Sequence, residues 1–181
     1  YFIGRIWERR NNLRQASAWY EKYMNSNPIN AAGVIEASYR LAKVYERRKR
    51  KKQAEDWYKK TVAVQRRLAA KTKNLGVSYA AEAKFKLVYK TYEELRRVKI
   101  PASPAGQKRA VDKKLGLINR LKEELKQVIK YDDGFQVVAS LALIGQAYQH
   151  MSAAIFNAPL PKGLDKASLQ QYKTAIAGVA K

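Results

Sequence analysis

A repeat with a period of 38 residues constrains the fold of this sequence more than any single motif does. Residues 4–10 (GRIWERR) return as residues 42–48 (AKVYERR), and residues 15–22 return as residues 53–60, with no gap between the two matches. A fixed period in this range is typical of supersecondary units that bury their apolar faces against copies of themselves. The repeat predicts a stack of similar units whose function depends on the surface that the stack presents.

Helical patterns fill nearly all of the sequence. The breaks between them fall at residues 27–30, 73–76, 100–106, 131–134 and 158–163. Asn30, Ser103 and Asp165 stand where a helix needs an N-cap, and Pro104 follows Ser103 at a first helical position. No β pattern of comparable strength occurs. We therefore expect an all-α protein of eight helices in four antiparallel pairs.

Apolar side chains at helical spacing predict which helix faces are buried. One predicted face carries Val34, Leu41, Val44 and Tyr45. Another, in the helix that follows the break at residues 131–134, carries Val137, Leu141, Ile144, Tyr148 and Met151.

The repeated unit resembles a tetratricopeptide repeat. That family combines Leu-Gly-x-x-Tyr in a first helix with Ala-x-x-x-Phe in a second helix and a closing Pro. The first unit has these spacings in Ile3-Gly4-x-x-Trp7, Ala16-x-x-x-Tyr20 and Pro28. The second has Leu41-Ala42-x-x-Tyr45 and Ala54-x-x-x-Tyr58, without the Pro. Residues 82–87 echo residues 36–41 at a spacing of 46, which indicates lengthened repeats, and residues 144–148 recover the first-helix pattern.

The resemblance implies an α-solenoid, a right-handed superhelix of about four antiparallel helix pairs. It implies one domain over residues 1–181, with units at about 1–28, 30–73, 76–131 and 133–181. Small residues let the two helices of a unit approach closely: Gly4 or Ala42 in the first helix, and Ala16 or Ala54 in the second. Aromatic side chains then fill the space between pairs.

The sequence also predicts whether it is part of a longer protein and where that protein is located. Because Tyr1 is not a Met and lies inside an expected helix, we expect the sequence to be part of a longer protein. Lengthened repeats of this kind resemble those of bacterial envelope proteins. This favours a periplasmic or envelope location, with the cytoplasm as the alternative.

A groove lined by the first helices is the binding surface that the resemblance implies. Its side chains would be Arg5, Glu8, Arg9, Glu36, Tyr39, Lys43, Glu46, Arg47, Phe85, Tyr89, Tyr92, Gln146, Gln149 and His150. The family's pocket for the C-terminal carboxylate of chaperones needs Asn where this chain has Arg5 and Lys43. We therefore expect a different ligand.

Positive charge is the second strong signal. The formal net charge is +22, from 37 basic and 15 acidic residues. Residues 43–73 hold 13 basic and 3 acidic residues, and residues 74–130 hold 14 and 6. A field of this strength attracts anionic partners and speeds their encounter, without selecting one class of anion.

The densest basic run has two interpretations. It consists of Arg47, Arg48, Lys49, Arg50, Lys51 and Lys52. Adjacent cations release counterions from a polyanion, so the run is a candidate nuclear-localisation signal or phosphate-binding patch. It also falls at a turn between two helices, where cations interact favourably with the C-terminal dipole of the preceding helix and are otherwise solvated.

Residues for catalysis or metal binding are scarce. There is no Cys, and His150 is the only His, with no second His or carboxylate pair at ligand spacing. No nucleophile, base and orienting group can be assembled from the sequence, and no Gly-rich phosphate loop follows a strand. We expect no enzyme activity, no metal and no cofactor. The densest apolar stretch, residues 137–144, is too short for a transmembrane helix.

Two functions remain. The first is a non-enzymatic scaffold that binds another protein, through an acidic or extended segment held in the groove and by the basic middle of the chain. The alternative is a nucleic-acid or anionic-polymer binder that uses the charge of residues 43–130, with aromatic side chains stacking on bases. Most of the aromatic residues fall at packing positions of the repeat, which favours the first function.

Overall fold

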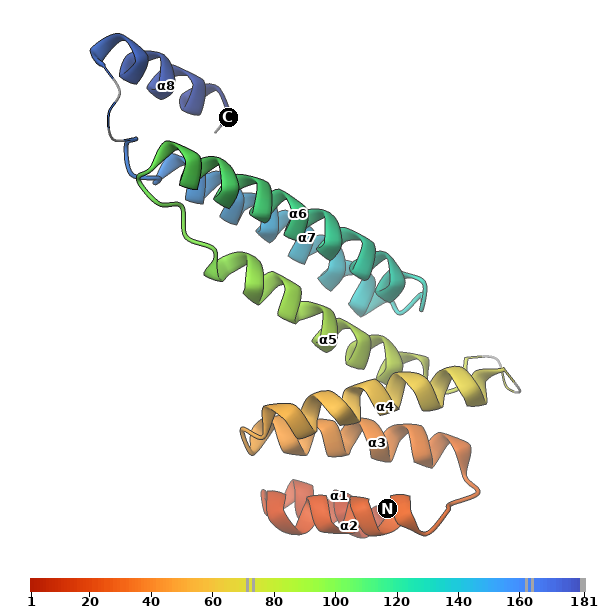
Figure 1. Cartoon of the computed structure of the whole chain (residues 1–181). Helices are drawn as coiled ribbons and strands as arrows, with labels where there is room; N and C mark the ends of the chain where they lie inside the picture. Colours follow the sequence, from red (N-terminus) through yellow and green to blue (C-terminus); the bar gives the residue numbers. More distant parts are fainter. Residues whose placement is uncertain (71, 73, 162, 164, 180–181) are drawn as a thin grey trace. The chain divides into compact units, whose positions relative to one another are not determined.

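A computed structural model of the chain is all-helical (Figure 1). It describes residues 1–70, 72, 74–161, 163 and 165–179, which form eight helices and no strand. The helices are α1 (Phe2–Arg9), α2 (Leu13–Asn25), α3 (Ala31–Arg47), α4 (Lys51–Ala69), α5 (Val77–Arg97), α6 (Pro104–Ile129), α7 (Gly134–Phe156) and α8 (Lys166–Val179). Helices next to each other in the sequence pack together from α1 to α4. The all-α class and the repeat-like arrangement are thus confirmed, whereas the superhelix and the single domain stay predictions.

The helices belong to two compact units. Unit 1 comprises Tyr1–Leu87 and Val128–Val137, and unit 2 comprises Val88–Gln127 and Val138–Lys181. Each unit is described below by itself.

The core of unit 1 forms where the repeat predicts close helix packing. Ala16, Ala42 and Ala54 are buried, together with the rings of Tyr20 and Tyr58. A Cβ atom on Gly4 would lie 2.7 Å from Cε1 of Tyr20, so α1 approaches α2 more closely than a larger residue allows. The predicted role of the small residues is confirmed here.

The 38-residue repeat is visible in the backbone of two turns. The C-cap residues of α1 and α3 are Arg10, with φ −76° and ψ 5°, and Arg48, with φ −77° and ψ 3°. The next residues, Asn11 and Lys49, have positive φ of 58° and 60°. Equivalent residues in the two copies therefore adopt the same conformation, and the repeat in the sequence is a repeat in the structure.

The side chains around these turns repeat as well. The hydroxyl of Tyr20 donates to Glu8 Oε2 at 2.7 Å, and that of Tyr58 donates to Glu46 Oε2 at 2.9 Å. Both tyrosines are buried, and in each pair the glutamate is on the first helix and the tyrosine on the second. The bond fixes the first helix of each repeat against its second helix.

Helix caps agree with the sequence where they can be compared. Asn30 accepts from the Gly33 N–H and Asp165 accepts from the Ser168 N–H, as predicted for two N-caps. The predicted breaks separate α2 from α3, α5 from α6, and α6 from α7. In the two other breaks, Lys73 and Lys162 lie outside the described residues.

The predicted buried face of α7 is partly wrong. Leu141 and Tyr148 are 58% and 46% exposed, whereas Ser140, Leu143 and Ala147 are buried. The amphipathicity of α7 is weak because apolar residues occur on most of its sides. Their spacing could not select one face, and Met151, which is 6% exposed, is the buried member of the predicted stripe.

Candidate partner-binding surfaces

The first-helix surface of unit 1, which the sequence predicts to line a groove, is cross-linked by ion pairs. Arg40 on α3 contacts Glu8 of α1, with Nη1 3.2 Å from Oε2, and Glu36 on its own helix, with Nε 2.6 Å from Oε1. Burial raises the pKa of Glu36, but hydrogen bonds from Tyr1 and Arg40 and the charges of Arg40 and Arg5 outweigh it, so that the pKa is lowered.

The same arrangement recurs between α3 and the first part of α5. Lys43 Nζ lies 3.0 Å from Glu82 Oε1, and Lys86 Nζ lies 3.1 Å from Glu46 Oε1. Sequence reasoning missed the roles of Arg40, Glu82 and Lys86. The signal was available, because residues 36 and 40 correspond to 82 and 86 at the spacing of 46 already noted.

Tyr39 is a packing residue and not a groove-lining one, contrary to the prediction. It is 8% exposed, and its ring centroid lies 5.2 Å from that of Tyr79 and 6.4 Å from that of Tyr58. Burial raises the pKa of Tyr39, and a hydrogen bond to Glu82 raises it further. Tyr92 in unit 2 is also 8% exposed and needs the same correction. Aromatic rings placed between helices lose their exposed area to the neighbouring helix.

The other predicted groove residues divide between the two units. In unit 1, Arg5 is half-buried and donates from Nη1 to the Tyr1 hydroxyl at 3.4 Å, and Phe85 is half-buried. In unit 2, Tyr89, Gln146 and Gln149 are exposed and His150 is half-buried. One continuous groove over all of them stays a prediction.

Among the residues that the structure describes, His150 contacts a lysine and no carboxylate. Lys114 has no exposed surface, and its Nζ donates to the Leu95 carbonyl at 2.9 Å and lies 3.3 Å from His150 Nε2. Burial lowers the pKa of His150, and the charges of Lys114 and Arg96 lower it further. Burial also lowers the pKa of Lys114. The pair therefore favours a neutral imidazole.

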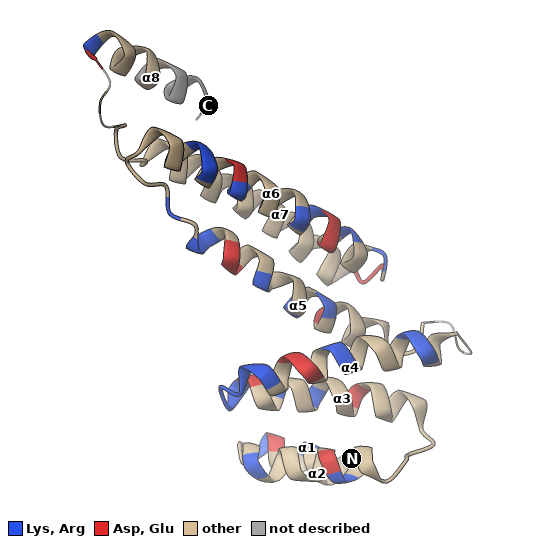
Figure 2. Ribbon diagram, in the orientation of Figure 1, with Lys and Arg blue, Asp and Glu red and all other residues tan. Residues whose placement is uncertain are grey.

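Positive charge gathers at one end of unit 1, where the α1–α2 and α3–α4 turns meet (Figure 2). We call this the basic turn surface, and its residues are Arg9, Arg10, Arg14, Arg47, Arg48, Lys49, Arg50, Lys51 and Lys52. Arg47 Nη2 donates to Asn11 Oδ1 at 2.7 Å, and Arg48 Nη1 donates to Ser17 Oγ at 2.6 Å. The first bond joins the turns of successive repeats, and the second ties the α3–α4 turn to α2.

The cations of this surface are not neutralised within the part of the chain that the structure describes. None of the nine forms an ion pair, in contrast to Arg40, Lys43 and Lys86 on the first-helix surface. Eight of the nine are exposed, and only Arg48 is half-buried. The surface can therefore accept several anionic groups without first breaking internal ion pairs.

Aromatic rings near the basic turn surface are covered by its own cations. The Arg10 guanidinium lies 5.7 Å from the Trp7 ring centroid, and that of Arg48 lies 5.5 Å from the Tyr45 centroid. Tyr45 is buried and its hydroxyl donates to Glu21. These rings hold arginine side chains in place and leave little face for a stacked base.

Helix α4 begins in the middle of this surface, with neither a side-chain cap nor an acidic residue at its start. Its N-cap, Arg50, makes no side-chain cap hydrogen bond, and its first turn contains no acidic residue. The first N–H groups of a helix have no intrahelical acceptor and carry a partial positive charge. They add to the field of Arg50, Lys51 and Lys52.

Other site types find no support in the described residues. No group of three or more Asp, Glu or His side chains there could hold a metal ion, and no helix there is both long and apolar enough to cross a bilayer. Comparison of the chain with protein-family models, with curated proteins and with solved structures finds no match.

Proposed function

We propose that this protein is a non-enzymatic scaffold of tetratricopeptide-like repeats that binds an acidic, extended segment of another protein on the basic turn surface. The family assignment draws on the packing of Gly4 against Tyr20 and on the matching turns at Asn11 and Lys49. Both features agree with the tetratricopeptide spacings in the sequence.

One observation carries the proposal: nine cations lie on two joined turns, and none has an ion-pair partner within the described part of the chain. The first-helix surface in unit 1 is a weaker site for an acidic ligand, because its cations already pair with Glu8, Glu46 and Glu82. Of the predicted groove residues, Arg9 and Arg47 belong to the basic turn surface and keep their predicted role in binding.

Nucleic acid is the second candidate, because the same cations suit phosphate groups. The covered rings of Trp7 and Tyr45 favour a protein partner, since binding of single strands relies on exposed aromatic faces as well as on charge.

Reversing charge at the start of α4 tests the proposal. The variant Arg50→Glu, Lys51→Glu, Lys52→Glu removes three exposed cations and places acidic residues in a helix first turn, where they stabilise the helix. We expect its affinity for a capped, labelled 16-residue peptide rich in Asp and Glu to fall by about tenfold or more, since three partly exposed ion pairs are lost. Fluorescence anisotropy at several salt concentrations measures this affinity.

The matched control is Lys108→Glu, Arg109→Glu, Lys113→Glu on α6. These three residues are exposed, and the variant changes the net charge by the same amount. An equal loss of affinity in both variants would mean that net charge alone sets binding, against the proposal. Tighter binding of a 16-nucleotide single strand than of the peptide, with log K falling steeply as salt rises, would favour the nucleic-acid alternative.

A further inference from the structure

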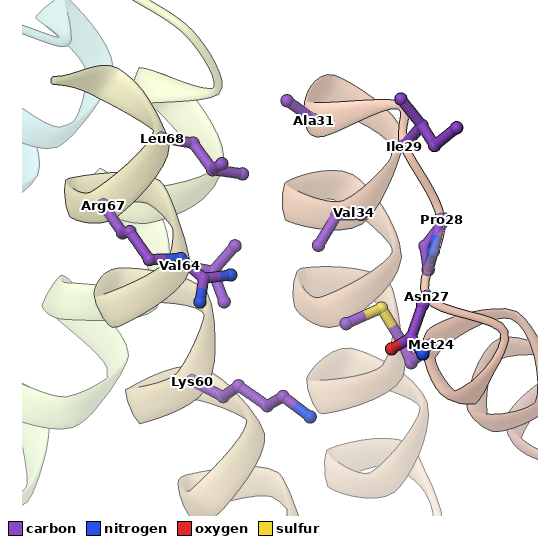
Figure 3. A pocket seen from close by; sticks show the side chains of 10 residues that line it. All are labelled: Met24, Asn27, Pro28, Ile29, Ala31, Val34, Lys60, Val64, Arg67 and Leu68. Atoms are coloured by element: carbon purple, nitrogen blue, oxygen red, sulfur yellow. The ribbon is translucent and has the colours of Figure 1, made fainter. Parts of the chain in front are cut away.

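A pocket lies in unit 1 at the far end of α4 from the basic turn surface (Figure 3). Its volume is about 310 Å³, and its walls come from the end of α2, residues 27–29, the start of α3 and the second half of α4. Met24, Val34, Val64 and Leu68 supply apolar surface. Ile29 at the rim is 100% exposed, so the apolar lining continues onto the surface of the protein.

The pocket results from unequal helix lengths. Residues 51–63 of α4 correspond to residues 13–25 of α2 at the period of 38, and α2 ends at Asn25. Helix α4 continues to Ala69, so Val64, Arg67 and Leu68 have no counterpart in α2. They face the loop after α2 and the start of α3, which do not fill the space beside them.

Of the described residues, two cations and no carboxylate line this apolar space. Lys60 and Arg67 extend from α4 toward α3 in Figure 3, on the same side of the helix as Val64. The Lys60 ammonium lies 4.2 Å from the Trp57 ring centroid, a contact that holds its position and leaves its charge unneutralised. Neither Lys60 nor Arg67 forms an ion pair within the described residues.

We propose that the pocket is a second peptide-binding site, which accepts one large apolar side chain from a protein segment whose neighbouring carboxylate pairs with Lys60 and Arg67. Its volume is at the lower end of the range for ligand pockets, which suits a single side chain. The exposed Ile29 and the amide of Asn27 on the rim offer apolar contact and hydrogen bonds to the flanking peptide. This site is independent of the basic turn surface.

Methionine methyl groups give a readout for this site alone. The chain has two methionines, Met24 in the pocket and Met151 on α7 in unit 2. In protein labelled with ¹³C at the methionine methyl groups, we expect a capped heptapeptide with one central Leu and flanking Asp residues to shift the Met24 signal saturably. The Met151 signal should stay unchanged.

Two comparisons separate the pocket from general charge attraction. We expect the same peptide with Ala in place of Leu to lose the Met24 shift, because the apolar side chain is what enters the pocket. We expect Lys60→Gln with Arg67→Gln to weaken binding of the Leu peptide by about tenfold, since two partly exposed ion pairs are removed. The control Arg109→Gln with Lys113→Gln, at exposed positions of α6, should keep the affinity.

Three results would overturn the proposal. One is an equal Met24 shift with the Leu and Ala peptides, and another is an unchanged affinity after Lys60→Gln with Arg67→Gln. The third is saturable occupation of the pocket by octanoate but not by the Leu peptide, which would assign it to small amphipathic acids. Because Met24 reports on the pocket only, failure of the basic turn surface as a binding site would leave these results unaffected.

Discussion

Lys114 is a fully buried lysine whose ammonium contacts a carbonyl and an imidazole, and no carboxylate within the described part of the chain. A buried cation without a counter-ion costs free energy, and here it also disfavours protonation of His150. Because the pKa of His150 is lowered in the folded state, the unfolded chain takes up a proton first as the pH falls. The contribution of His150 to the free energy of unfolding is therefore fully present above about pH 6.5, and it is lost as the pH falls below that value.

Lys114→Met should raise the pKa of His150 part of the way back to its usual value. The variant removes the nearby positive charge and leaves the effects of burial and of Arg96. We also expect the free energy of unfolding to rise by about 1 kcal/mol, because Met fills a similar volume and the Leu95 carbonyl keeps the Val98 N–H at 3.3 Å.

The pKa of His150 can be measured by NMR. Because the chain has a single histidine, its ring protons give one set of signals to follow against pH. The exposed neighbour Lys113→Met serves as the control for the loss of one charge. A pKa of His150 that is the same in Lys114→Met as in the unchanged protein would show that the lysine does not act on the imidazole.

For single residues, the sequence predicts roles that depend on the residue's own helix, and it misses roles that depend on a neighbouring helix. Asn30 and Asp165 were predicted as caps because an N-cap bonds to N–H groups within the next turn of its own helix. The burial of Tyr39 and Lys114 depends on which neighbouring helix covers them, and spacing along one helix does not contain that information.

At the scale of elements, the connection from α4 to α5 depends on one glycine. Gly76 has a positive φ of 63°, and a Cβ atom there would lie 2.6 Å from Cγ2 of Ile35 on α3. Its carbonyl accepts from the Ala80 N–H at 3.1 Å, which starts α5. The glycine thus allows the chain to turn into α5 while it touches α3.

Gly76→Ala should lower the free energy of unfolding by about 2–4 kcal/mol. The left-handed backbone and the overlap with Ile35 both oppose a Cβ atom, and each costs on the order of 1–2 kcal/mol. Chemical denaturation measures the loss. In contrast, Gly116→Ala inside α6, where nothing lies within 4 Å of the new Cβ, should raise stability by up to about 1 kcal/mol. Equal effects of the two substitutions would refute this role of Gly76.

The elements could be predicted where repeats and breaks are explicit, and the spacing of 46 indicated lengthened repeats, but not what the extra length leaves unfilled. The period of 38 anticipated the shared turns after Arg10 and Arg48. It did not anticipate the pocket, because the pocket exists where α4 extends beyond the length of α2 and the correspondence between the copies ends.

For the whole molecule, the net charge of +22 opposes compaction. Ion pairs on the first-helix surface offset part of this repulsion, but exposed pairs contribute less than about 1 kcal/mol each. Most of the 37 basic side chains have no acidic counterpart, since the chain has 15 acidic residues.

Salt should therefore stabilise the protein. We expect the Tm to rise by about 5 °C when NaCl is raised from about 20 mM to about 300 mM, because the Debye length falls to within the spacing of neighbouring cations. Thermal unfolding followed by circular dichroism measures it. A Tm that falls with salt would mean that the ion pairs, and not the unpaired cations, dominate. A larger rise with sulfate at equal ionic strength would point to anions bound at discrete sites.

The uncapped start of α4 gives the proposed ligand a structural role of its own. The N-cap of this helix makes no side-chain hydrogen bond to its leading N–H groups, which lie beside Arg50, Lys51 and Lys52. A carboxylate arriving from a partner would complete the helix as an intermolecular cap. Binding of the partner would then slow amide hydrogen exchange in the first turn of α4. The same contact would bind the partner and make the start of the helix more rigid.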